Sequence, residues 1–148
     1  MYSKMDGKRS LSAPLLKGPT MGRKKILIID DETLILKTTA LLLKHADMDA
    51  ITATGGMEGI ALAEKEKPDI IMLDIIMPGM DGWSVLSRLK ADDRLSGIPV
   101  IVFTAGDQAD SDRMARERGA SAVCRKPFNP HELTKIIDGL NKGDVHEQ

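Results

Sequence analysis

The chain has 148 residues, 42% of them hydrophobic and 29% charged, with a net charge of −1. This balance predicts one globular domain with its own core, and the single cysteine, Cys124, excludes an internal disulfide. No apolar run approaches the roughly 18 residues of a membrane span, and the N-terminus has no signal-type stretch, so we expect a cytoplasmic protein without a membrane partner.

Residues 1–23 are rich in Ser, Pro, Gly and Lys and have no apolar period. They predict a flexible basic extension, or a segment left by expression, ahead of a domain at 24–143 and a tail at 144–148. Residues 1–25 hold seven basic side chains and one acidic side chain, a balance of +6. We expect a solvated linker here and no direct nucleic-acid binding, because the only aromatic residue is Tyr2.

Short apolar runs alternate with helical patterns along the rest of the chain. The runs predict strands at 25–30, 50–54, 70–74, 100–103 and 122–124. The patterns between them predict helices at 32–46, 57–67, 81–89, 107–118 and 129–143. This alternation predicts an α/β fold, with a doubly wound five-stranded parallel sheet and helices on both faces.

Three helices carry further signals. The first is expected to bury one stripe, composed of Ile35, Thr39, Leu42 and Ala46. Asp81 is a candidate N-cap for the third helix. In the last helix Asn129 is a candidate N-cap, and Glu132 completes a capping box.

The most continuous apolar run, Ile70–Leu73, ends on an acid, Asp74. A carboxylate at the end of a strand that is buried on both faces is costly unless its charge is used. Polar residues also end three other predicted strands: Asp30 and Asp31, Thr104, and Lys126. Because the carboxyl ends of parallel strands share one edge, we expect all of these side chains in one cleft.

Three carboxylates in one cleft repel one another and raise each other's pKa. A magnesium ion would relieve this conflict, because it prefers oxygen ligands. A carboxylate beside the ion can attack phosphorus and form an aspartyl phosphate. Lys126 and Thr104 are the residue types that would stabilise the remaining phosphoryl oxygens.

Four motifs follow one another at these strand ends: ILIIDD at 26–31, LDIIMPGMDG at 73–82, FTA at 103–105 and KPF at 126–128. With them the chain resembles the receiver domain of two-component response regulators, of the chemotaxis-regulator type, from about Lys24 to Asn141. The resemblance implies the flavodoxin-like strand order 2-1-3-4-5. It also implies a phosphorylation-activated switch that changes partner binding.

The resemblance further implies a role for each residue of the cleft. Asp74 would accept the phosphoryl group, from a sensor histidine kinase or a histidine phosphotransfer protein. Mg²⁺ would be bound by Asp31 and Asp74, by the carbonyl of Ile76, and by Asp30 largely through water. The phosphoryl oxygens would contact Thr104, the backbone of Ala105, and Lys126. The protein would be a signalling module and not an enzyme, catalysing only its own phosphorylation and dephosphorylation, and its signal would reach a downstream protein or a missing output domain.

Three positions depart from the family pattern. Val123 stands where most receivers have Tyr or Phe, three residues before the lysine. Ile76 and Gly106, each two residues after a site residue, replace the polar side chains of many members. In the family, rotation of that aromatic ring is coupled to movement of the threonine, so the resemblance makes Thr104 and Val123 the candidates for the switch.

Two other functional classes remain open on the residues alone. A phosphatase that passes through an aspartyl phosphate would need a second acid two residues after the nucleophile, where this chain has Ile76. A docking module that keeps only the fold would not need the acidic cleft. We also expect Trp83 near the mouth of the cleft.

Overall fold

The computed structural model describes residues 23–105 and 109–141, which contain five strands and five helices in alternation. Their order is β1 (Lys25–Ile29), α1 (Thr33–His45), β2 (Asp49–Ala53), α2 (Gly56–Glu66), β3 (Ile70–Asp74), α3 (Gly82–Ala91), β4 (Val100–Thr104), α4 (Ala109–Glu117), β5 (Ala122–Arg125) and α5 (Pro130–Asn141). The strands form one parallel sheet in the order β2-β1-β3-β4-β5. The predicted fold class and strand order are confirmed. The predicted extension, up to residue 22, and the predicted tail lie outside the described residues.

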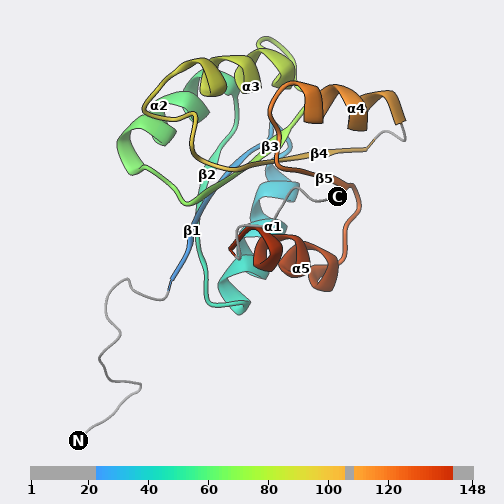
Figure 1. Ribbon diagram of the computed structural model, residues 1–148. Coiled ribbons are helices and arrows are strands. Elements are labelled where there is room, and N and C mark those ends of the chain that lie inside the picture. The colour runs from blue at the N-terminus through green and yellow to red at the C-terminus, as the bar shows by residue number, and fades with distance from the viewer. Residues whose placement is uncertain (1–22, 106–108, 142–148) are drawn as a thin grey trace, which may run out of the picture.

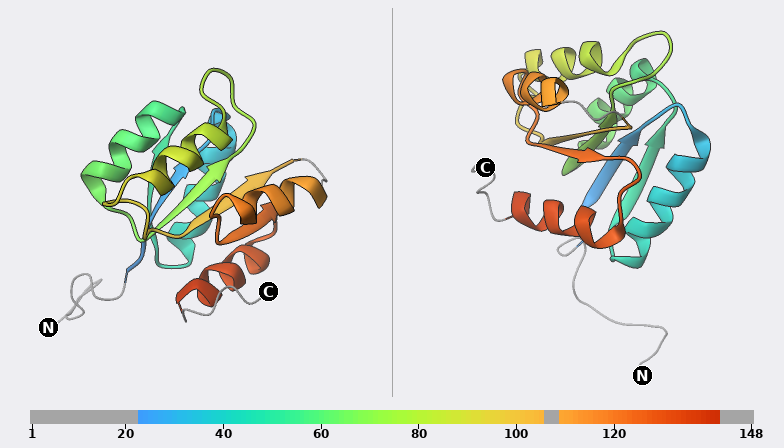
Figure 2. Two further views of the ribbon diagram at one scale, coloured as in Figure 1. Left: turned by 45° about the horizontal axis from the view of Figure 1, so that its top comes forward. Right: turned by 90° about the vertical axis from the view of Figure 1, so that its right-hand side faces the viewer.

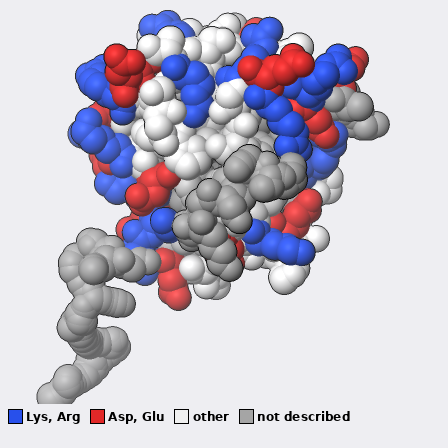
Figure 3. Space-filling model, in the orientation of Figure 1, with Lys and Arg blue, Asp and Glu red and all other residues white. Residues whose placement is uncertain are grey.

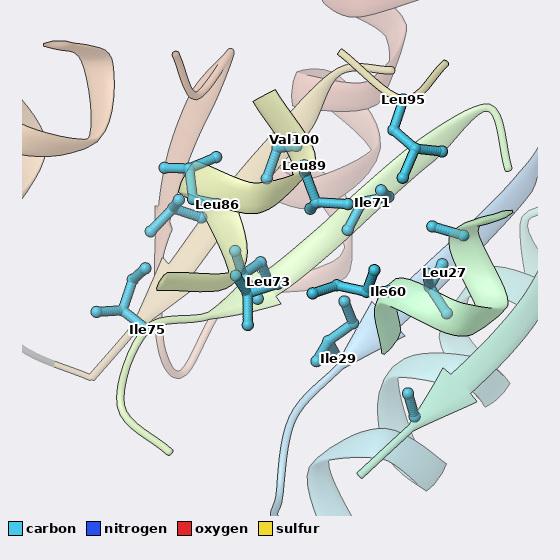
Figure 4. Close-up of a cluster of buried hydrophobic side chains, with 14 of the residues drawn as sticks. Leu27, Ile29, Ile60, Ile71, Leu73, Ile75, Leu86, Leu89, Leu95 and Val100 are labelled. Carbon is cyan, nitrogen blue, oxygen red and sulfur yellow. The ribbon is translucent and has the colours of Figure 1, made fainter. Parts of the chain in front are cut away.

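Helices cover both faces of the sheet, with α2, α3 and α4 on one side and α1 and α5 on the other (Figures 1 and 2). Successive strand residues point to opposite faces, so each central strand supplies two cores. Leu27, Ile29 and Leu73 belong to the cluster under α2, α3 and α4, part of which Figure 4 shows. Ile26 and Ile28 belong to the cluster under α1 and α5. The two helix layers hold the sheet between them, and with it the edge at which the strands end.

The buried stripe of α1 differs from the prediction by one residue. Thr39 is buried as predicted, and the other three predicted residues are partly buried against the core: Ile35, Leu42 and Ala46. The other fully buried side chains, Leu36 and Leu43, lie one position further along the chain than Ile35 and Leu42. Apolar residues occur on several sides of this helix, so their spacing alone does not show which side faces the sheet. Packing of α1 against the sheet determines which of them are fully buried.

Two predicted caps are confirmed. Asp81 Oδ1 accepts a hydrogen bond from Ser84 N (2.9 Å), and Asn129 Oδ1 accepts one from Glu132 N (2.7 Å). Both side chains satisfy a backbone N–H that the first helical turn leaves without a partner. The cap at Asp81 fixes the start of α3 directly after the loop that follows Asp74.

Gly82 allows α3 to begin against the end of β3. A Cβ atom at this position would lie 2.4 Å from the carbonyl oxygen of Asp74 and 2.4 Å from Ile75 Cα. Backbone atoms cannot move aside as a flexible side chain can. The glycine is therefore required for the position of Asp74.

We expect Gly82→Ala to lower the free energy of unfolding by about 1–3 kcal/mol, the usual range for overpacking, as measured by urea denaturation. Gly139→Ala is the matched control, because nothing lies within 4 Å of a Cβ atom there. Gly139 lies in the last turn of α5, where its replacement by alanine should raise stability by less than about 1 kcal/mol. Equal effects of the two substitutions would contradict the steric argument.

Candidate phosphorylation site at the carboxyl edge of the sheet

The ends of the strands form an open hollow of about 500 Å³. Its lining residues come from the ends of β1, β3, β4 and β5 and from the loop after β3: Asp31, Glu32, Asp74, Ile76, Met77, Pro78, Ala105 and Lys126. β1 and β3 are neighbours in register, with Ile29 beside Leu73, so the acids that follow these strands lie side by side. The predicted convergence is confirmed as geometry for the three acids and Lys126. Thr104 is not among the residues that line the hollow.

Three carboxylates form the acidic part of the site. Each of Asp30, Asp31 and Asp74 has an oxygen within 4.8 Å of the other two. Asp30 is fully buried and Asp74 is 2% exposed, whereas Asp31 reaches solvent. Buried carboxylates this close together need a cation or a proton to offset their charge.

Lys126 supplies the positive charge. Its Nζ lies 3.0 Å from Asp30 Oδ2, 3.1 Å from Glu32 Oε1 and 3.5 Å from Asp74 Oδ2. It also lies 5.1 Å from the centre of the Phe103 ring, a cation–π distance. The lysine follows β5 and precedes a cis peptide bond to Pro127. One ammonium thus faces three carboxylates in this protein.

The surroundings of Asp74 disfavour its charge. Burial, and next the neighbouring Asp30 carboxylate, raise the pKa of Asp74 from 3.8 to about 7. The Lys126 ammonium and the hydrogen bond from Ile76 N to Asp74 Oδ1 (3.2 Å) act in the opposite direction. For Lys126, burial lowers the pKa, but the carboxylates of Asp30, Asp74 and Glu32 outweigh it and raise the pKa overall.

The donor set fits a magnesium ion. It offers hard oxygen ligands, more negative charge than Lys126 neutralises, and an open side through which water ligands can enter. Asp30 Oδ2 is buried and, among the described residues, has no well-oriented hydrogen bond besides its ion-pair contact with Lys126. A second cation would satisfy this excess of acceptor oxygens.

The other predicted residues occupy different depths. Thr104 ends β4 and is 3% exposed, and its carbonyl accepts a hydrogen bond from Lys126 N (2.9 Å). Ala105 is exposed and lines the hollow, as does Ile76, whose side chain is largely exposed. Val123 is half-buried on β5, opposite Val102 of β4. Gly106 lies outside the described residues.

Two features of the site were not predicted from the sequence, and one residue lies elsewhere than predicted. Glu32 was assigned only to a helix start, yet its side chain contacts Lys126 across 94 positions of sequence. Phe103 and Phe128 pack edge to face, with centroids 6.1 Å apart, directly beside Lys126; their presence in the FTA and KPF motifs was an available signal. Trp83 does not line the cleft, because its ring lies under Arg118 (5.4 Å) in a separate hollow.

Among residues 23–105 and 109–141, no helix combines the length and the apolar character that crossing a membrane requires.

Comparison with known proteins gives a consistent result. The family model for the response regulator receiver domain matches residues 26–138. Protein PilH of Pseudomonas aeruginosa is 38% identical over 120 residues, which is 80% of this chain and 98% of PilH. The alkaline phosphatase synthesis transcriptional regulatory protein PhoP of Bacillus subtilis is 37% identical over 117 residues, 79% of this chain but only 48% of PhoP. Among solved structures, the chemotaxis protein CheY4 of Vibrio cholerae superposes with a TM-score of 0.75 at 27% identity, covering 79% of this chain and 98% of CheY4.

Proposed function

This chain belongs to the response regulator receiver domain family, and we propose from its site that Asp74 is the phospho-acceptor of a signalling switch. Receiver domains are signalling modules that take phosphoryl groups from histidine kinases or phosphotransfer proteins. One observation carries the assignment to Asp74. Its carboxylate ends the central strand β3, lines the open hollow, and lies within reach of both the other acids and Lys126.

We assign the other residues by the chemistry that each can supply. Mg²⁺ would be held by Asp31, Asp74 and the carbonyl of Ile76, with Asp30 acting mostly through water. When bound, the ion supplies the positive charge that lets these carboxylates and an anionic phosphoryl group share one pocket. Thr104, the backbone N–H of Ala105, and Lys126 would donate to the phosphoryl oxygens.

In the transfer, an oxygen of the Asp74 carboxylate attacks phosphorus and forms an O–P bond. The bond from phosphorus to the leaving atom of the donor breaks, and that atom keeps the electron pair. With a phosphohistidine donor, the leaving imidazole nitrogen takes up a proton from solvent. Loss of the phosphoryl group to water reverses the modification, and the protein acts on no other substrate. A general acid two residues after Asp74, which a phosphatase would use, is absent because Ile76 stands there.

The signal would pass from the phosphoryl group through Thr104 and Val123 to a downstream protein or an output domain. We take 24–143 as the receiver domain, preceded by a linker. We do not expect direct binding to nucleic acid. Basic and acidic side chains are interspersed over the described residues on the face that Figure 3 shows, which supports this expectation.

The proposed function is tested by incubating the protein with Mg²⁺ and acetyl phosphate. One phosphoryl group should appear, stable in acid and labile to hydroxylamine, and borohydride reduction should place it on the peptide that contains Asp74. Omitting Mg²⁺ is the control and should remove most of the label. A label on another residue would overturn the assignment.

We further expect Asp31→Ala to weaken magnesium binding by at least about tenfold, the effect of losing one charged ligand. Asp30→Ala should have a smaller effect, because Asp30 already contacts Lys126 and would reach the ion through water. Isothermal titration measures both affinities. Trp83 is a poor reporter for this purpose, since it lies outside the hollow. Equal losses of affinity would contradict the two roles.

A further inference from the structure

Glu32 has a side chain that serves Lys126 and not its own helix. It occupies the N-cap position of α1, where a short polar side chain usually accepts a hydrogen bond from the first turn, and its side chain makes no such bond. Its Oε1 lies instead 3.1 Å from Lys126 Nζ and accepts a hydrogen bond from it. Helix capping therefore does not explain the position of this carboxylate.

Three carboxylates surround the ammonium of Lys126, and among the described residues its well-oriented hydrogen bond goes to Glu32. An ammonium has three N–H donors, and the carboxylates of Asp30, Glu32 and Asp74 lie within 3.5 Å of this one. A phosphoryl group on Asp74 that binds Lys126 therefore competes with the carboxylates of Asp30 and Glu32 for this ammonium. The side chain of Asp30 is completely buried, whereas that of Glu32 is 60% exposed. Glu32 is the partner that can turn into water at the smallest cost.

We propose that Glu32 holds Lys126 in the unphosphorylated receiver and competes with the phosphoryl group for its ammonium, so that Glu32 slows phosphorylation of Asp74. The inference rests on the proposed function, in particular on the role of Lys126. Glu32 is a positioning residue, because its side chain acts through Lys126. Its backbone N–H donates to Asp30 Oδ1 (2.9 Å), a contact that substitution of the side chain leaves in place.

If the Glu32 charge only repels the anionic donor from a distance, the expected results differ from those of a direct contact with Lys126. Glu32 lines the mouth of the hollow and would repel an anionic donor even without touching Lys126. Glu32→Asp separates the two, because it keeps the charge but shortens the side chain by one methylene, which withdraws the carboxylate from Lys126. A field effect leaves Glu32→Asp close to wild type, whereas a direct contact makes it resemble Glu32→Gln.

The rate of labelling by acetyl phosphate with saturating Mg²⁺ is measured by intact-protein mass spectrometry. We expect Glu32→Gln and Glu32→Asp each to raise the rate by about two- to fivefold, the range that a partly exposed ion pair permits. Glu117→Gln, which removes an exposed charge from α4, is the matched control and should leave the rate unchanged. Wild-type rates for both Glu32 variants, or acceleration in Glu32→Gln alone, would overturn the inference.

A second readout needs neither phosphate nor metal. In EDTA, Glu32→Gln should lower the urea midpoint of the otherwise wild-type protein, because Lys126 loses a partner. In a Lys126→Met background the same change should raise the midpoint, since Glu32 then only repels the other acids. The same sign in both backgrounds would overturn the inference. Labelling of Asp74 at a rate that Glu32 does not affect would overturn the inference and keep the proposed function, and absence of label in the wild type would overturn both.

Discussion

Asp74→Asn is expected to abolish phosphoryl labelling and also to make the metal-free protein more stable at pH 8, by about 2–4 kcal/mol. Labelling fails because an amide is not a nucleophile toward phosphorus. Stability rises because the substitution removes a buried charge that Asp30 repels, while the amide oxygen can still accept the hydrogen bond from Ile76 N. The replacement of one carboxylate oxygen by an amide nitrogen would thus abolish labelling and raise stability.

The gain should depend on pH in a definite direction. The pKa of Asp74 rises from 3.8 to about 7 on folding, so between these values the unfolded chain releases a proton that the folded protein keeps. The wild type therefore loses stability at this group as the pH rises from about 4 to 7, and Asp74→Asn does not. Urea denaturation in EDTA at pH 4 and pH 8 measures the difference. Asp138→Asn, an exposed position on α5, is the control, and a gain of equal size at both pH values would contradict the argument.

Magnesium should reverse this ranking of stabilities. An ion that binds only the folded state stabilises it by about 2.7 kcal/mol at a concentration one hundred times the dissociation constant. Asp74→Asn removes one charged ligand and should gain much less. At pH 8 with excess Mg²⁺, the wild type should therefore approach or exceed the stability of the variant. If the proposed magnesium site is correct, the metal-free site is the less stable form of the two.

The fold and the acidic site could be predicted because both depend on position along the chain. In a parallel α/β sheet, residues that end different strands meet at one edge, so Asp74 and Lys126 could be placed together without knowing any loop. The caps at Asp81 and Asn129 were equally local signals, and the structure confirms them.

What could not be predicted depends on contacts between distant residues. Nothing near Glu32 in the sequence indicates that its side chain faces Lys126, because the contact depends on how α1 begins relative to the end of β5. The fully buried residues of α1 were only partly predicted for a related reason. Leu42 and Leu43 are equally apolar, and only packing on the sheet distinguishes them. The contact of Trp83 with Arg118 likewise joins residues that are far apart in the sequence.

Lys126→Met is expected to lower the free energy of unfolding of the metal-free protein at pH 8 by about 3–5 kcal/mol, the usual loss when one partner of a buried ion pair is removed. Methionine keeps an apolar side chain of similar length beside the Phe103 ring, so the substitution removes mainly the charge. Asp30, which is completely buried, and Asp74 would then lack their cation. Breaking this pair is costly because the buried carboxylates keep their mutual repulsion and lose the nearby positive charge.

The loss should be smaller at pH 6, because Lys126 lowers the pKa of Asp74, and without it the carboxyl keeps its proton to a higher pH. Excess Mg²⁺ should restore part of the stability at pH 8, since it replaces the missing charge next to the same oxygens. Lys135→Met, an exposed position on α5, is the control and should change stability by less than about 0.5 kcal/mol. A loss that neither pH nor Mg²⁺ alters would mean that Lys126 contributes by packing, and that the acids do not depend on its charge.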